Sequence, residues 1–263
     1  GMGKSTKVYV GLVVETKRNG TLEVTKVLPK GRSEVLFCSG YTTCARNDHV
    51  LAGNVKNLTY PSVEGVGYIG EGCFKVSVQE GGKSKVSGSY YLWAAMLGRC
   101  YNTRKKCYPR YGGVGAYVVD EWHNYQNFAA WYYSQDVRDV GISWNIDKDL
   151  EYTCNRIYCP SKCNIIPSDV NSIFTGSSKI TGARYSPQNN GRSWKAVISI
   201  QKEDVYLGKY YTEQEAIEVY TTAKIAHCNK VANTYREFLP EVIYNNLTSR
   251  DYVLAVLADK RNK

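Results

Sequence analysis

The chain has 263 residues, of which 43% are hydrophobic and 22% charged, so it can bury sizeable cores and is not a disordered polypeptide. Its 34 Lys and Arg against 24 Asp and Glu give a net charge of +10, which favours polyanionic partners. No stretch approaches the roughly 18 apolar residues of a membrane-spanning helix, so we expect no membrane partner.

Nine cysteines, an odd number, without an N-terminal apolar segment indicate reduced thiols and a cytoplasmic location. Cys154, Cys159 and Cys163, with Cys100 or Cys107, could supply four thiolates to a zinc ion. Zinc sites normally repeat a short cysteine spacing, and neither spacing here repeats. We therefore expect buried thiols and no structural Zn²⁺.

Residues 3–86 are predicted to form a small β module. Apolar residues alternate along short segments, and Asn19-Gly20, Lys30-Gly31 and Ser39-Gly40 are typical of the turns between strands. Many glycines follow from Gly65 to Gly82, which indicates a linker or loop region with one weak strand at 74–78.

Residues 87–175 are predicted to form a mixed central module. Helical spacing favours helices over 90–101 and 124–134, and strands are expected at 116–119, 142–150 and 156–158. A further helix should open near Pro167, with Ser168 as its N-cap.

Residues 176–263 are predicted to form a sheet packed on a helix. Segments 194–200 and 205–208 indicate a hairpin, and Thr212 with Glu215 forms a capping box. The helix that follows should bury one apolar stripe, and one or two short helices interrupted at Pro240 should end the chain. That stripe comprises Ala216, Val219, Tyr220, Ala223 and Ala226.

The chemistry suggested by the central module is that of a one-metal nuclease. Asp147 ends the first predicted strand and Asn171 lies in the helix that follows the second. Both side chains are oxygen donors suited to Mg²⁺ or Mn²⁺ beside a scissile phosphate. Such a site also needs a neutral imidazole to take a proton from the attacking water.

The same stretch resembles the HNH endonucleases of phage and homing type. The resemblance is carried by Ile146-Asp147-Lys148-Asp149 and by Ile165-Ile166-Pro167-Ser168-Asp169-Val170-Asn171, with Leu97-x-Arg99-Cys100-Tyr101-Asn102 and Tyr111-Gly112-Gly113 upstream. It covers residues 91–174. It implies a ββα-metal domain with Asp147 and Asn171 on the metal, and a phage-encoded protein in the cytoplasm of a bacterial host.

The chain departs from this family at the general base, where Lys148 replaces the family's His. A lysine acts as a base only when burial lowers its pKa, and a phosphate nearby raises it, so Lys148 is better suited to holding phosphate. His123 is a candidate replacement, although a lone His beside Trp122 is more often structural. Asp149 is either a second ligand or an exposed strand end.

The predicted C-terminal sheet gathers basic and aromatic residues on its outer face. Alternation places Lys195 and Tyr206 there, with Arg184 and Arg192 nearby, and such a face can enter the major groove of DNA. The alternative is a sheet that packs only within the protein.

This segment resembles the APETALA-type, or ethylene-response-factor, DNA-binding domain. The matching residues are Gly182-x-Arg184-Tyr185, Trp194-Lys195-Ala196-x-Ile198, Val205-Tyr206-Leu207-Gly208 and Thr212-x-x-x-Ala216-x-x-x-Tyr220. The resemblance implies that Arg184, Tyr185, Lys195 and Tyr206 lie on DNA-contacting strands. In the N-terminal module, Tyr41-Thr42-Thr43-x-Ala45-Arg46 resembles segments ahead of the phage HNH core, which makes Arg46 a further candidate.

The sequence thus predicts an α+β protein with a small N-terminal β module, a central ββα-metal domain and a C-terminal three-stranded antiparallel sheet packed on a helix. The leading hypothesis is binding of double-stranded DNA with Mg²⁺-dependent nicking or cutting. The alternatives are a catalytically inactive DNA-binding regulator and a protein that uses the same scaffold to bind another protein.

Overall fold

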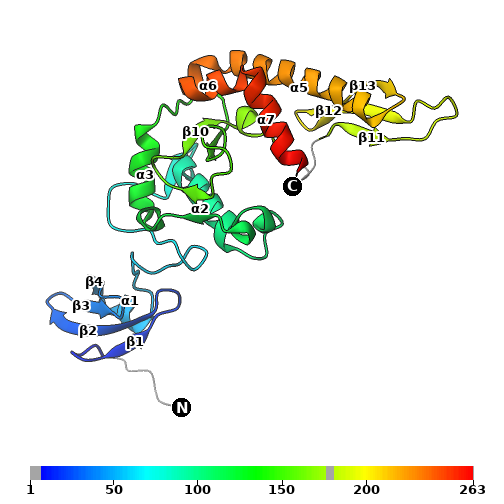
Figure 1. Cartoon of the computed structure of the whole chain (residues 1–263). Helices are drawn as coiled ribbons and strands as arrows, with labels where there is room; N and C mark the ends of the chain where they lie inside the picture. Colours follow the sequence, from blue (N-terminus) through cyan, green and yellow to red (C-terminus); the bar gives the residue numbers. More distant parts are fainter. Residues whose placement is uncertain (1–6, 176–180, 263) are drawn as a thin grey trace. The chain divides into compact units, whose positions relative to one another are not determined.

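The computed structural model describes residues 7–175 and 181–262, which form a mixed α+β structure with several small sheets (Figure 1). Contacts divide the chain into two compact units, Gly1–Ser134 with Arg156–Cys159, and Gln135–Asn155 with Pro160–Lys263. The predicted module starts at residues 3 and 176 lie outside the described residues, and the three-module division stays a prediction.

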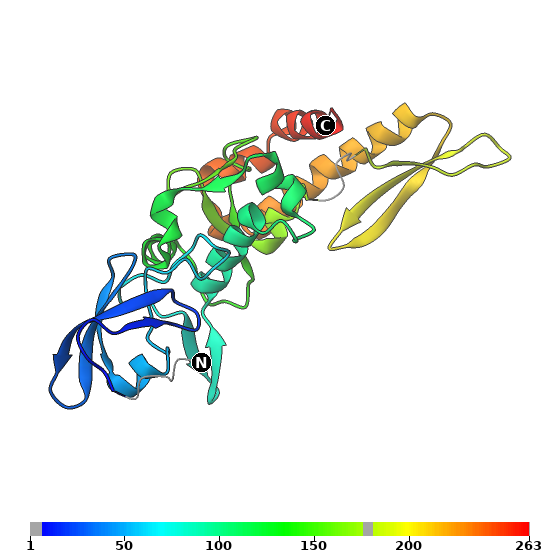
Figure 2. The same cartoon turned by 90° about the horizontal axis from the view of Figure 1, so that it is seen from below.

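The first unit begins with an antiparallel sheet in the order β1-β2-β3-β4, which is drawn in blue in Figure 2. Alternating residues of β2 and β3, among them Leu22, Val24 and Val35, point into one core, as the period-2 pattern predicts. The elements are β1 (Val13–Glu15), β2 (Thr21–Leu28), β3 (Arg32–Phe37), β4 (Thr42–Arg46) and helix α1 (Asn47–Leu51).

The glycine-rich region contains a hairpin, so the prediction of one weak strand at 74–78 is wrong. Strand β5 (Ser77–Glu80) pairs with β6 (Lys83–Val86) across a turn at Gly81 and Gly82. Both glycines have positive φ, which is the geometry that a tight hairpin turn needs. A pair of glycines is typical of linkers as well as of tight turns, so the sequence alone did not reveal the hairpin.

An aromatic core completes the first unit. Helix α2 (Gly88–Tyr101) starts at Ser87, whose side chain accepts a hydrogen bond from the amide of Tyr90, and α3 (Tyr125–Ser134) packs beside it. Trp93, Trp122 and Phe128 are fully buried between these elements. Short 3₁₀ turns, η1 (Tyr108–Arg110), η2 (Gly112–Val114) and η3 (Asp120–His123), connect the helices through β7 (Tyr117–Val118).

The strand pairing around the predicted nuclease motif differs from expectation. Strand β9 (Ile157–Tyr158) pairs in parallel with β7, whereas β8 (Trp144–Asp147) pairs antiparallel with β10 (Asn164–Pro167). Residues 156–158, the predicted second strand, are thus not the partner of β8, and the strand at 164–167 was not predicted. The buried apolar pair Ile165 and Ile166 gives β10 its place opposite β8.

One turn of helix, α4 (Ser168–Asn171), follows β10 directly. Its N-cap is Pro167, so the prediction of Ser168 as the N-cap is wrong. The Ser168 hydroxyl instead accepts a hydrogen bond from the Asn145 side-chain amide at 3.1 Å. This bond ties α4 to β8, and the order in the chain is strand, strand, helix.

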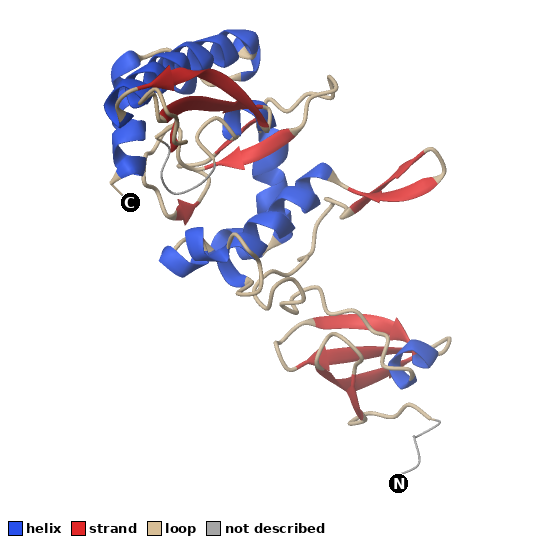
Figure 3. Cartoon of the chain, turned by 90° about the vertical axis from the view of Figure 1, so that its right-hand side faces the viewer, coloured by secondary structure: helices blue, strands red, loops and turns tan. Residues whose placement is uncertain are grey.

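The second unit continues with an antiparallel sheet in the order β11-β12-β13 that lies beside helix α5, as Figure 3 shows. Thr212 and Glu215 form the expected capping box at the start of α5. The elements are β11 (Ala183–Tyr185), β12 (Trp194–Ile200), β13 (Glu203–Tyr210), α5 (Glu213–Thr234), η4 (Arg236–Phe238), α6 (Glu241–Leu247) and α7 (Arg250–Arg261).

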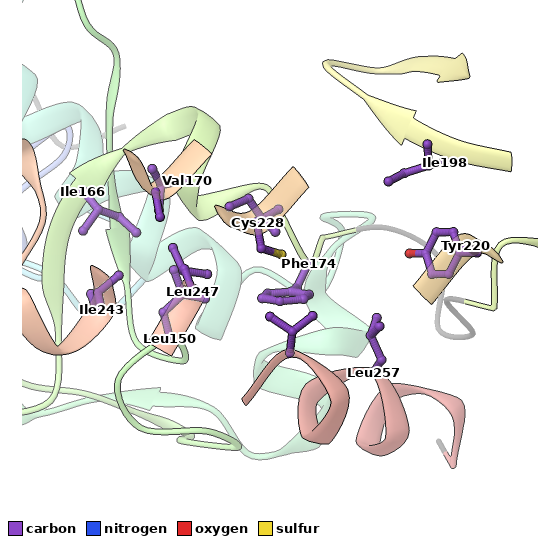
Figure 4. Close-up of a cluster of buried hydrophobic side chains, with 13 residues drawn as sticks. Leu150, Ile166, Val170, Phe174, Ile198, Tyr220, Cys228, Ile243, Leu247 and Leu257 are labelled. Atoms are coloured by element: carbon purple, nitrogen blue, oxygen red, sulfur yellow. The ribbon is translucent and has the colours of Figure 1, made fainter. Parts of the chain in front are cut away.

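The core of the second unit joins Leu150, β10 and α4 to the helices and to the C-terminal sheet (Figure 4). The buried stripe of α5 recurs at every fourth residue, and Ala226, which we placed in it, is exposed. Its buried positions are Ala216, Tyr220, Lys224, Cys228 and Ala232. Lys224 donates to the carbonyl of Ile173 and lies over the Phe174 ring, which explains how a charged residue occupies this stripe.

Within the described residues, no helix is both long enough and apolar enough to cross a membrane.

Candidate nucleic-acid interface

Three cations form a row across the outer face of the C-terminal sheet. In the strand register Arg184 of β11 lies opposite Lys195 of β12, and Lys195 lies opposite Lys209 of β13. Directly opposed residues of antiparallel strands project to the same face, where like charges repel one another. An anion bound over this row would relieve that repulsion.

A β-bulge places the third cation in the row. The pairing shifts between Ala196, which lies opposite Gly208, and Val197, which lies opposite Tyr206, so that Leu207 is the extra residue. Gly208 has a φ of +128°, a conformation that L side chains rarely adopt. Because of the extra residue, both Tyr206 and Lys209 share the outer face, whereas strict alternation would put Lys209 on the inner one.

An ion pair fixes Arg184 on this face. Its Nη1 lies 2.6 Å from Oδ2 of Asp204, near the start of β13. The hydrogen bond from Arg184 lowers the pKa of the Asp204 carboxyl, which keeps the pair ionised at neutral pH. Both side chains are about half exposed, at 57% and 50%, so the pair orients the guanidinium more than it stabilises the fold.

A shallow pocket of about 350 Å³ lies on the same face. Arg184, Lys195 and Asp204 supply its charged groups, and Tyr206, which is 59% exposed, supplies an aromatic ring. Tyr185 also lies at the pocket, but it is paired with Trp194 and its ring is edge-on to that of Trp194, so its side chain projects from the other face of the sheet. Cations beside exposed aromatic rings suit a phosphate next to a base or sugar.

The other two predicted DNA contacts lie elsewhere. The guanidinium of Arg192 sits 5.2 Å from the centre of the Tyr211 ring and is not among the residues that line the pocket. Arg46 belongs to the first unit and forms an exposed ion pair with Asp48 at 2.7 Å. The structure therefore brings Arg184, Lys195 and Tyr206 together on the outer face, whereas the Tyr185 side chain lies with Trp194 on the other face.

In the predicted nuclease motif, Asp147 is buried in a turn. Its Oδ2 accepts a hydrogen bond from the backbone amide of Leu150 at 2.9 Å, and only 6% of the residue is exposed. Burial raises the pKa of this carboxyl to about 7. These contacts give Asp147 a structural role, because its carboxylate closes the turn that follows β8.

Lys148 is engaged within the same turn. Its Nζ donates to both carboxylate oxygens of Asp149, at 2.9 and 3.0 Å, and to the carbonyl of Asn155 at 2.6 Å. The side chain is only 9% exposed. Because the ammonium group of Lys148 is buried in an ion pair with the Asp149 carboxylate, it is poorly placed to bind a phosphate. The same ion pair engages Asp149.

The strand register separates the two predicted metal ligands along the hairpin. Asp147 lies opposite Asn164, whereas Trp144 at the other end of β8 lies opposite Pro167, from which α4 and Asn171 continue. Three residues of strand span about 10 Å. Among the described residues, no hydrogen bond joins Asp147 to Asn171, and no group of three or more His, Cys, Asp or Glu could bind a metal ion.

His123 lies in the first unit, and Asp147 lies in the second. The Nε2 of His123 is 3.0 Å from the Val118 carbonyl, and its ring is edge-on to Tyr101. Both contacts are those of a structural histidine. Of the cysteines considered for zinc, Cys159 and Cys163 are buried, while Cys154 is exposed with its Sγ 3.6 Å from Asp259.

Sequence reasoning missed Lys209 and Asp204. A glycine inside a strand often marks a bulge, so Gly208 was the available signal for the changed register that brings Lys209 to the outer face. For Asp204, knowledge of the pairing was needed, because Arg184 and Asp204 lie on strands that are not neighbours in the sheet.

In comparisons with known proteins, no protein-family profile, curated protein or solved structure matches this chain significantly. The HNH-like and APETALA-type resemblances therefore stay predictions.

Proposed function

We propose that this protein binds double-stranded DNA through the outer face of strands β11–β13. The observation that carries the proposal is the row of Arg184, Lys195 and Lys209 across all three strands. A sheet of this width fits the major groove, where cations contact phosphates and guanidinium groups can also contact base edges. The net charge of +10 agrees with a polyanionic partner.

The exposed tyrosine of the outer face supports the same partner. Tyr206 projects from β13 beside the pocket and is 59% exposed. Exposed aromatic side chains beside cations can pack on sugars and bases, which adds contact area to the electrostatic attraction. The resemblance of this segment to the APETALA-type domain points to the same strands.

The variant that tests the proposal is Arg184→Ala with Lys195→Ala. Binding of a labelled duplex, measured by fluorescence anisotropy over a series of salt concentrations, should weaken at least roughly ten-fold, since charge-assisted contacts contribute about 1.5–3 kcal/mol each. The slope of log K against log salt should become shallower by about 2. Lys230→Ala, which removes an exposed charge from α5, is the control and should bind as the wild type does.

Unchanged affinity in the double variant would overturn the proposal. Lys209→Ala provides a second check, because it alone should reduce the salt slope by about 1. This residue reaches the face only through the bulge.

Metal-dependent cleavage stays a separate prediction. The contacts of Asp147 and Lys148 favour the alternative of a DNA-binding protein without efficient cleavage. A plasmid-nicking assay with Mg²⁺ or Mn²⁺ decides it. Nicking by the wild type that is lost in Asp147→Asn, a variant that keeps an acceptor for Leu150, would restore the nuclease hypothesis. Equal absence of nicking in both would exclude it.

A further inference from the structure

A second strongly basic surface lies in the first unit, after the end of α2. Residues 99–119 contain no Asp or Glu, and their cations follow one another closely. Arg104, Lys105, Lys106 and Arg110 are all exposed. Neither the proposed sheet interface nor the predicted nuclease motif uses them.

The loop that carries these cations is folded tightly. The amide of Lys105 donates to the Asn102 carbonyl at 3.1 Å, and the amide of Tyr108 donates to the Lys105 carbonyl at 2.9 Å. The Asn102 side chain accepts from the amide of Arg104 at 3.0 Å. Gly112 lies so close to the Cys100 carbonyl that a Cβ would be 2.0 Å from its oxygen. The loop is thereby held against the end of α2, so its cations are held in place.

A fifth exposed cation joins the loop from a distant part of the sequence. The amide of Tyr117 donates to the carbonyl of Arg156 at 2.9 Å where the parallel pair β7–β9 begins. The guanidinium of Arg156 lies 3.8 Å from the position that a Cβ on Gly115 would occupy. The pairing of these strands therefore places a further exposed cation beside Gly115, in the same acid-free stretch of the chain.

The needs of the fold do not account for this charge. A helix C-terminus favours a nearby cation, and Arg99 in the last turn of α2 already supplies one. Arg99 is half-buried, hydrogen-bonded to Tyr158 and stacked over the Tyr111 ring. The Nζ of Lys105 and the Oε1 of Glu64 lie 2.8 and 3.2 Å from the position that a Cβ on Gly98 would occupy, so the Lys105 side chain packs against α2. Arg104 and Lys106 are exposed beyond the helix end.

We propose that Arg104, Lys105, Lys106, Arg110 and Arg156 form a second DNA-binding surface, the α2 loop surface, which holds the phosphate backbone of duplex DNA without reading its sequence. Clustered exposed cations on a rigid loop bind phosphates by releasing counterions, and such contacts carry no base information. This proposal rests on the proposed function only because both name duplex DNA as the partner. The residues of the α2 loop surface lie in the other unit from the sheet.

The test compares two triple variants of the full chain that lose the same charge. Arg104→Gln, Lys105→Gln and Lys106→Gln together remove three cations of the α2 loop surface. The control, Arg18→Gln, Lys26→Gln and Lys56→Gln, removes three exposed cations elsewhere in the same unit. Binding of a random-sequence duplex is measured by anisotropy from low to moderate salt. In the loop variant, the slope of log K against log salt should become shallower by about 2 to 3, since each phosphate contact contributes about 0.9. In the control variant, the slope should change little.

This assay distinguishes failure of the sheet proposal from failure of the α2 loop surface. Equal slopes for the loop variant and the control would overturn the α2 loop surface, while a loss in Arg184→Ala with Lys195→Ala would still support the sheet. A loss in the loop variant alone would support the α2 loop surface and overturn the sheet proposal, and binding by no protein would overturn both. Because Lys105 packs near Gly98, the double variant Arg104→Gln with Lys106→Gln is measured as well, and should lose about 2 from the slope without disturbing that contact.

Discussion

Asp147 shows how a residue in a motif can serve the fold. Its carboxylate is the acceptor for the Leu150 amide inside a buried turn, where water cannot solvate the charge. The next residue, Lys148, is held by Asp149 and by the Asn155 carbonyl. At this scale, the contacts made by the side chains, and not the letters of the motif, indicate what they do.

The raised pKa of Asp147 predicts a pH dependence of stability. Between the ordinary pKa of an aspartate near 3.8 and the folded value of about 7, the folded state binds more protons than the unfolded state. Stability from this group is therefore greatest below the lower value and falls as pH rises through the window.

Asp147→Asn keeps an acceptor for Leu150 without a charge. We expect the free energy of unfolding of this variant, relative to that of the wild type, to increase by roughly 2 to 3 kcal/mol when the pH rises from 5 to 8. One pKa unit corresponds to about 1.4 kcal/mol. Urea unfolding of both proteins at the two pH values measures this difference. A difference that does not change with pH would contradict the burial of a carboxylate with a raised pKa.

The C-terminal sheet and α5 are held together at a close approach between a glycine and a ring. Gly182 has a φ of +67°, and a Cβ there would lie 2.0 Å from the Tyr220 ring. Tyr220 is buried in the core of the second unit, so neither side can move away freely. The position of the basic face relative to the helix depends on this contact.

Gly182→Ala should therefore destabilise the second unit by at least about 2 kcal/mol, through overpacking added to backbone strain. Gly141→Ala is the matched control, since Gly141 has a φ of +74° in the same unit but open space around its Cα. It should cost only the strain, about 1 kcal/mol. Chemical unfolding monitored by circular dichroism compares the two, and equal losses would show that the Tyr220 contact is unimportant.

Most helices and the hairpin of β12 and β13 were predictable from sequence, whereas the hairpin of β5 and β6 and the non-local strand pairs were not. The capping box at Thr212 and the hairpin of β12 and β13 follow from short-range patterns. The parallel pair β7–β9 and the partner of β8 depend on contacts between distant segments, so no local pattern reveals them. In the candidate interface the same distinction holds, because Arg184, Lys195 and Tyr206 were predicted, while Lys209 needed the bulge and Asp204 needed the full sheet.

For the whole molecule, each of the two units builds one of the two proposed DNA-binding surfaces by itself. In one unit, cations line the face of a sheet, and in the other they follow a loop at the end of a helix. A chain with two such surfaces should bind duplex DNA more tightly than either unit does, because the second contact becomes intramolecular once the first has formed.

The most direct test of the sheet proposal is hydrogen–deuterium exchange of the full chain with and without a duplex at low salt. DNA seated on the outer face should slow amide exchange in β11–β13, at residues 183–185, 194–200 and 203–210, since a ligand that binds only the folded sheet suppresses its opening. The turn around Asp147 and Lys148 should exchange at the same rate in both samples. Slowed exchange that spares all three strands while DNA is bound would contradict the account.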